Sequence, residues 1–196
     1  MSINLYLNKN DMKKITNFLI FSFIIMGIFV MLTSSCKKNE TTTTISDDNF
    51  YKQVGYALVM CYNDIYNQNL AGHSVGSQNI TVNGPMGGTV IITGTTGYSS
   101  NNGITTTDLT FAMTSVKYTT NASGFETEIT LNGAATYTGS FSSSYTSLNH
   151  QSDNLNISGS VTHNDIVRKI DMTGIVSINR LTSTVTANIF GNSVSW

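Results

Sequence analysis

The sequence has little of the residue types that most often carry chemistry or stiffen a chain. It contains one proline, two cysteines and three histidines, and only 11% of its 196 residues are charged. Lys and Arg number 10 against 11 Asp and Glu, so no excess of positive charge is present to hold a nucleic acid. Two cysteines cannot form a disulfide-rich scaffold. An apolar share of 40% excludes a fully disordered chain.

Small polar residues are abundant in the sequence, in contrast to the scarce charged residues. The chain contains 28 threonines, 23 serines and 22 asparagines. Threonine fits the pleated surface of a strand, and serine and asparagine favour turns, whereas the helix formers Lys and Glu are few. The composition therefore predicts a mainly β protein.

The N-terminal segment has the order of a secretory signal peptide. Lys13 and Lys14 precede an almost continuous apolar run over residues 15–32, and three small residues separate this run from Cys36. The stretch resembles the signal peptide and lipobox of bacterial lipoproteins. Leu32 lies one position further from the cysteine than the usual branched residue of that family.

The resemblance implies that Cys36 is the lipidation site. In that family a diacylglyceryl group is added to the thiol, the chain is cut before the cysteine, and the new amine is acylated. Lys37 stands where an aspartate would favour retention in the inner membrane, so the resemblance implies an outer-membrane location in the cell envelope, outside the cytoplasm. Two alternatives stay open. The apolar run of about 18 residues is long enough for an uncleaved membrane anchor, and Met12 is a second candidate start.

The expected organisation has three parts. A signal peptide covers residues 1–35, the lipidated cysteine and a flexible polar tether cover 36–46, and a single globular domain covers 47–196. A chain of this length can bury a sizeable core.

Residues 47–70 are predicted to form an amphipathic helix. Its apolar positions recur on one face at the helical period: Phe50, Val54, Ala57, Leu58, Cys61 and Ile65. Ser46 supplies an N-cap oxygen, Asp47 and Asp48 place negative charge at the helix N-terminus, and Gly72 ends the segment.

The remainder, residues 77–196, follows the two-residue period of strands. The candidate strands cover 78–83, 88–96, 104–119, 125–137, 139–148, 154–162, 166–179 and 183–190. Short turn sequences between them favour antiparallel neighbours. The predicted fold is mainly β, with one N-terminal amphipathic helix packed on a curled antiparallel β-meander or partly open barrel of about eight strands.

An apolar-x-apolar-x-Gly pattern recurs along these strands. Its glycines are Gly84, Gly94, Gly133, Gly159 and Gly174. Their irregular spacing does not fit the fixed rung of a solenoid. Each glycine shares a face with two apolar residues, so we expect these glycines to let the sheet curl and to leave a hollow for the helix face. Chance matches in a glycine-containing sequence are the alternative.

The patterns that could carry chemistry are weak. Residues 72–76 match G-x-S-x-G, but a helix precedes and a strand follows, the reverse of a nucleophile elbow. His73, His150 and His163 show no metal-ligand spacing and are expected at the surface or in turns. Cys61 lies on the apolar helix face and is expected to be a small core residue.

Other polar groups are expected to be structural. Glu126 and Glu128 are predicted to point into solvent from one strand face. Four aspartates near strand ends or turns form no calcium loop: Asp108, Asp153, Asp165 and Asp171. The helix tyrosines at 51, 56, 62 and 66 are expected at a sheet border with their hydroxyls in water. No catalytic, cofactor-binding or metal-binding residue is assigned.

Three classes of function remain after these exclusions. The predicted function is that of a non-enzymatic, membrane-tethered envelope lipoprotein with a structural or partner-binding role, the partner being an envelope protein or a polymer. The alternative is a carrier for an apolar ligand held between helix and sheet. A hydrolase would need acidic or histidine side chains gathered in one cleft.

Overall fold

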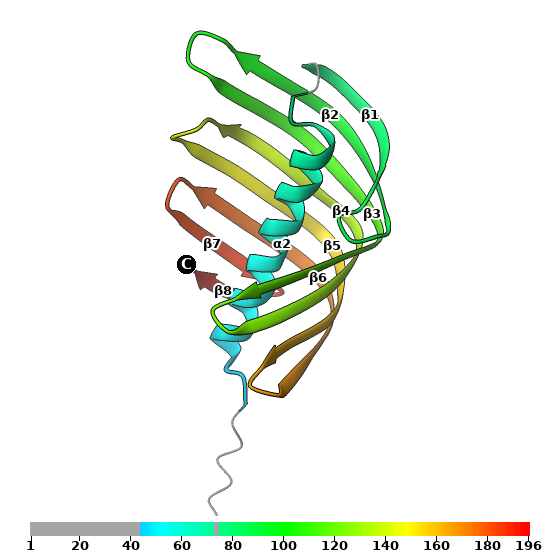
Figure 1. The fold of residues 1–196 in the computed structure, drawn as a ribbon, viewed down its shortest axis with the longest axis vertical. Helices are drawn as coiled ribbons and strands as arrows, with labels where there is room; N and C mark the ends of the chain where they lie inside the picture. The colour runs from blue at the N-terminus through cyan, green and yellow to red at the C-terminus, as the bar shows by residue number, and fades with distance from the viewer. Residues whose placement is uncertain (1–43, 73–74) are drawn as a thin grey trace, which may run out of the picture. The chain divides into compact units, whose positions relative to one another are not determined.

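The computed structural model describes residues 44–72 and 75–196. The chain divides into two units, residues 1–42 and 43–196, and every described residue belongs to the second. This unit contains one described helix and eight strands in a single sheet (Figure 1). No helix in the described ranges is long and apolar enough to cross a membrane.

Helix α2 spans Asp47–Asn69 and begins at a side-chain cap. The hydroxyl of Ser46 accepts a hydrogen bond from the backbone N–H of Asn49 at 3.4 Å. At the other end the N–H of Leu70 donates to the carbonyl of Tyr66, and Gly72 has a φ of +80°. The predicted helix is confirmed to within a residue at each end, because its cap and its apolar period are both local signals.

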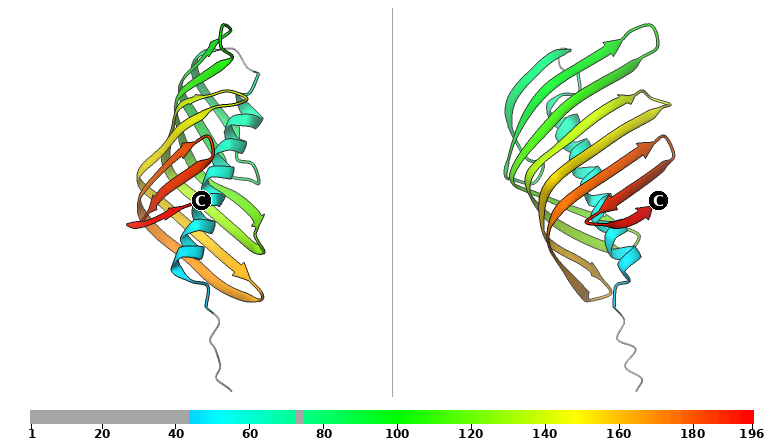
Figure 2. Two further views of the ribbon diagram at one scale, coloured as in Figure 1. Left: turned by 90° about the vertical axis from the view of Figure 1, so that its left-hand side faces the viewer. Right: turned by 180° about the vertical axis from the view of Figure 1, so that it is seen from behind.

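The eight strands follow one another in the sheet in chain order and pair antiparallel throughout. Their bounds are β1 Gly76–Asn83, β2 Thr89–Ser99, β3 Ile104–Ala122, β4 Phe125–Phe141, β5 Thr146–His163, β6 Ile166–Leu181, β7 Thr184–Ile189 and β8 Asn192–Ser195. β1 and β8 form the two edges, so the sheet is open. Figure 2 shows the sheet curving around the side on which α2 lies. The mainly β, antiparallel, eight-stranded prediction is confirmed.

The predicted strands differ from the structure at three places. The segment 139–148 is no strand of its own, because β4 continues through Gly139 to Phe141 and the chain turns only at residues 142–145. β5 starts at Thr146, eight residues before the predicted strand 154–162. β8 was not predicted. Gly139, with a φ of +132°, lies within β4, so the predicted break at residue 138 between two strands does not exist.

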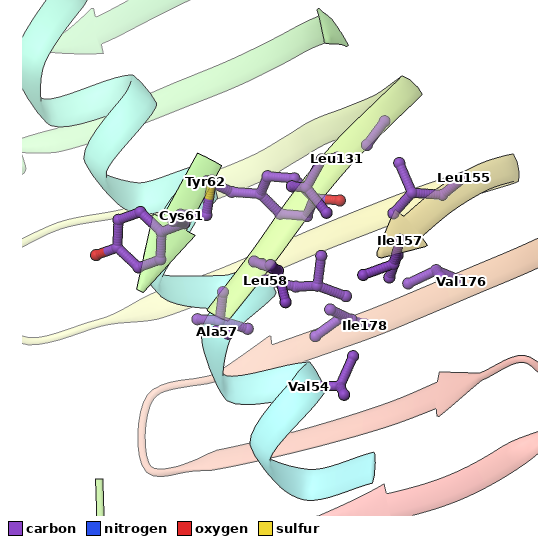
Figure 3. Packing of buried hydrophobic residues seen from close by; sticks show 14 of the residues in the cluster. Val54, Ala57, Leu58, Cys61, Tyr62, Leu131, Leu155, Ile157, Val176 and Ile178 are labelled. Carbon is purple, nitrogen blue, oxygen red and sulfur yellow. The ribbon is translucent and has the colours of Figure 1, made fainter. Parts of the chain in front are cut away.

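The inner face of the sheet and one face of α2 form a single apolar core. Figure 3 shows Val54, Leu58 and Cys61 of α2 against side chains of β4, β5 and β6. The fully buried residues of the helix are Val54, Ala57, Leu58, Cys61 and Ile65, and those of the sheet include Phe111, Leu131, Leu155, Ile157 and Ile178. Their removal from water is the main force that holds helix and sheet together.

Glycines of the recurring pattern stand where the strands bend. Gly94, Gly133, Gly159 and Gly174 have positive φ, whereas Gly84 lies in the loop after β1 and does not. At Gly159, with φ +146°, a Cβ would come within 2.0 Å of the carbonyl oxygen of Glu128 on β4. Only glycine fits such a close approach of two backbones.

Polar contacts join α2 to β3 and β6. The hydroxyl of Tyr118 donates to Asp64 at 2.5 Å, and the guanidinium of Arg180 donates to the amide oxygen of Asn63 at 2.8 Å. At the helix N-terminus Arg168 forms an ion pair with Asp47 at 2.7 Å. These contacts add directional bonds to the apolar packing of α2 on the sheet.

Candidate functional site

Several residues singled out from the sequence lie outside the described residues. They are Cys36 with the whole signal peptide, and His73 and Ser74 of the G-x-S-x-G match. Lipidation of Cys36 therefore stays a prediction. The two flanking glycines are described: Gly72 follows the helix, and Gly76 begins β1.

A buried group of rings lies between α2 and the sheet. His150 on β5 is 1% exposed, and its ring lies 5.2 Å from that of Tyr62 and 4.9 Å from that of Tyr137. Tyr66 stacks on Tyr137 at 5.4 Å. The prediction that His150 is a surface or turn residue is wrong, because residue 150 lies on the inner face of β5. The prediction that the hydroxyl of Tyr62 lies in water is also wrong, because this hydroxyl is buried.

The imidazole of His150 is held neutral. Burial, and secondly the positive charge of Arg180, lower its pKa from the ordinary 6.5 to about 4. The hydroxyl of Tyr62 has no hydrogen-bond partner among the described residues. A ring so enclosed cannot reach a substrate in solution, so this group of rings is a structural feature rather than an acid–base site.

The remaining candidates of the sequence behave as expected. Cys61 is fully buried, and burial raises the pKa of its thiol, so it is a core residue. Glu126 and Glu128 are exposed on the outer face of β4. The four aspartates are likewise exposed and dispersed. Asp165 lies in the turn before β6, whereas Asp108, Asp153 and Asp171 lie within β3, β5 and β6 rather than near strand ends. Within residues 44–72 and 75–196 no three His, Cys, Asp or Glu side chains gather into a metal site.

His163 joins two neighbouring hairpin ends, as expected of a turn residue. Its Nδ1 lies 3.0 Å from the carbonyl oxygen of Gly124, and its Nε2 lies 3.1 Å from the side-chain nitrogen of Asn164. A carbonyl only accepts, so Nδ1 carries the proton and Nε2 accepts from the amide. The ring stacks on Phe125 at 4.2 Å. Both nitrogens are therefore occupied by structural hydrogen bonds.

The outer face of the sheet carries the most regular arrangement of polar groups. Strand register aligns its side chains into two adjacent lines that each cross all eight strands, here called the outer polar rows. The first row is Ser77, Thr95, Asp108, Thr138, Asn149, Asn179, Thr186 and Ser195. The second row is Asn79, Thr93, Thr110, Thr136, Gln151, Ser177, Asn188 and Ser193.

The outer polar rows are almost free of charge. Asp108 is their one ionisable member, and every other side chain ends in a hydroxyl or an amide. Neighbouring strands lie about 4.8 Å apart, so the rows present donors and acceptors at that repeat. At the irregular stretch of β4 and β5 the hydroxyl of Thr136 accepts from the N–H of Gln151 at 3.0 Å, which keeps the second row continuous.

Two surface hollows lie along these rows. One, of about 490 Å³, is lined by the β6, β7 and β8 members of both rows and by the ion-paired Asp48 and Lys52. The other, of about 320 Å³, lies where the β4–β5 pairing is interrupted and is lined by Thr110, Thr136 and Gln151. The rows and their hollows form the candidate functional site.

Comparison of the chain with protein-family models, with curated proteins and with solved structures finds no significant match. The function of the candidate site therefore follows from its geometry and chemistry alone.

Proposed function

We propose that this protein is a non-enzymatic lipoprotein of the cell envelope, tethered through Cys36, whose sheet binds a neutral partner through the outer polar rows. The partner is an envelope polymer or protein that offers hydrogen-bonding groups along its length. In this proposal the N-terminal amphipathic helix is packed on the curled sheet and holds it in shape.

The observation that carries the proposal is the continuity of the outer polar rows. Fifteen of their sixteen side chains are neutral hydroxyl or amide groups, aligned by the register of the sheet. Such groups hydrogen-bond but do not exchange protons near neutral pH, so they suit binding rather than acid–base catalysis. A line of equivalent groups at a fixed repeat matches an extended partner better than a compact one.

The absence of a reactive cluster on this face also supports binding. Glu126 and Glu128 are exposed neighbours on one strand, and Asp108 is the only carboxylate in the rows. The two hollows supply recesses for groups that project from a partner.

Cell fractionation of a Cys36→Ala variant tests the tether and the binding face together. We expect the variant to leave the membrane fraction, because the acyl chains on the thiol would be lost. We expect the released protein still to sediment with envelope fragments from which lipid has been removed by detergent. Replacing Thr138 and Asn149 by Lys in the same variant should reduce that sedimentation at least tenfold.

Matched controls separate the two parts of the proposal. Cys61→Ala changes the other cysteine, which is buried, and should stay in the membrane fraction. Asn121→Lys adds charge to the outer face at a hairpin end, away from the rows, and should keep the binding to lipid-free fragments. Membrane retention of Cys36→Ala would contradict the tether, and undiminished binding of the double Lys variant would contradict the role of the rows.

A further inference from the structure

The two edges of the open sheet differ in how well they are protected. β8 has four residues, and the ring of Trp196, which directly follows it, lies against Gly55 of α2. β1 has eight residues, and among the described strands it pairs with β2 alone. Natural sheets usually block an open edge with a lysine, a proline, a bulge or a covering element. β1 has no charged residue and no proline, and it pairs with β2 in unbroken register.

Within residues 44–72 and 75–196 no strand lies beside the outer edge of β1, so its backbone groups on that side are available for pairing. The N–H of Gly84 donates to the carbonyl of Gly88 at 3.1 Å, in the same register as the β1–β2 pairs. In an antiparallel pair such bonds fall on every second residue. Gln78, Ile80 and Val82 therefore bond toward β2, and the odd-numbered residues from Ser77 to Asn83 direct their N–H and C=O groups outward.

The apolar core also reaches this edge without being closed there. Ile80 continues the inner row of Ile92 and Phe111, and Val82 continues that of Val90. The side chains of β2 are fully buried at these positions, whereas Ile80 and Val82 are only half-buried. A strand added beside β1 would remove the remaining apolar surface from water.

Exposed apolar side chains lie at both ends of β1. Val75, just before the strand, is 59% exposed, and Met86, just after it, is 55% exposed. In an antiparallel pairing of two copies the start of one strand lies beside the end of the other. Val75 of each copy would then lie next to Met86 of the other, so the edge complements itself.

We propose that two copies of this chain associate through β1, pairing antiparallel about a twofold axis to form one continuous sheet. Self-pairing fits this edge because neither β1 nor β2 carries a charge that a second copy would repel. The interface is isologous, because each copy contributes the same backbone groups, the same half-buried Ile80 and Val82, and the same flanking side chains. The outer polar rows of the two copies would then be continuous across the interface.

Site-directed cross-linking of the full chain tests this pairing. Thr81→Cys places an exposed thiol in the middle of β1, and Ser195→Cys places one on the opposite edge as the matched control. The unchanged chain, with its natural Cys36 and Cys61, gives the background. With a short bis-maleimide reagent we expect Thr81→Cys to give a species of twice the chain mass, at least fivefold above Ser195→Cys. Adding Val75→Lys and Met86→Lys to Thr81→Cys should lower that yield at least fivefold, through repulsion.

Each other outcome overturns the proposal. Equal yields at positions 81 and 195 would indicate random collision. A product whose mass differs from twice that of the chain would place another protein on the edge. A yield unaffected by the two lysines would exclude the flanking contacts. All the changed residues are exposed, and circular dichroism of each variant verifies the fold. The test works in membranes or in detergent solution, so its outcome does not depend on the proposed tether.

Discussion

At the scale of single residues, His150 couples the stability of the fold to pH. Its pKa is about 4 in the folded chain, because of burial first and of Arg180 second, against 6.5 when the ring is free. Between pH 6.5 and pH 4, His150 therefore binds a proton in the unfolded chain but stays neutral in the folded chain. The contribution of His150 to the free energy of unfolding is complete above pH 6.5 and is lost as the pH falls to 4, by an amount on the order of 3 kcal/mol.

A His150→Phe variant should remove this pH dependence. Phenylalanine can occupy the space between Tyr62 and Tyr137 and has no proton to bind. Chemical denaturation at pH 7 and at pH 4.5 measures the change in the free energy of unfolding. His163→Phe is the control and should keep the loss seen in the unchanged chain. The same loss of stability in His150→Phe would show that other groups cause it.

His150 also shows why the sequence did not predict the inner group of rings. Residue 150 falls between the candidate strands 139–148 and 154–162 and was therefore expected in a turn, whereas β5 runs through it. In the second half of β5 the odd residues Leu155 and Ile157 face the core, so simple alternation would also point residue 150 outward. The register shift between Ser152 and Leu155 reverses that parity, so His150 faces inward. A bulge of this kind has no signature in the local sequence when the residues around it are Ser, Asp and Asn.

At the scale of elements, the bend of β5 depends on Gly159. Gly159→Val would place a Cβ 2.0 Å from the Glu128 carbonyl at a φ of +146°. We expect the free energy of unfolding to fall by on the order of 3 kcal/mol or more, because either the β4–β5 pairing or the backbone angle must give way. Thermal unfolding followed by circular dichroism measures the effect.

The control for this substitution is Gly103→Val. Gly103 also has a positive φ, +63°, but no atom lies within 4 Å of its added Cβ. Gly103→Val therefore has an unfavourable backbone angle but no clash with a neighbouring strand. Its melting temperature should fall less than that of Gly159→Val. Equal melting temperatures in the two variants would mean that the approach of β4 to Gly159 is not a constraint.

The elements themselves were predictable to the extent that their signals are local. Ser46 and the 3.6-residue period place α2 correctly, and the turns at residues 121–124 and 164–165 separate β3 from β4 and β5 from β6. The outer polar rows were not predictable, because they exist only through register between strands. Thr136 and Gln151 are fifteen residues apart in sequence and meet through a hydrogen bond. Alternating Thr, Ser and Asn within single strands was the one available signal.

At the scale of the whole described unit, helix and sheet share one core, which predicts a single cooperative unfolding transition. Leu58 of α2 is fully buried against the sheet, whereas Gln68 of the same helix is exposed. Leu58→Ala should lower the free energy of unfolding by about 3 kcal/mol, and Gln68→Ala by less than about 0.5 kcal/mol.

The chain contains its own probe for this cooperativity. Trp196 is the only tryptophan, and its ring lies against Gly55 at the N-terminal half of α2. Its fluorescence reports the contact of helix with sheet edge, while far-ultraviolet circular dichroism reports the strands. In Leu58→Ala the two signals should shift together and keep the same midpoint, because removal of the helix exposes the inner face of every strand that it covers. Separate midpoints would mean that the sheet stays folded without α2, and the helix would then be an attachment to the fold rather than a part of its core.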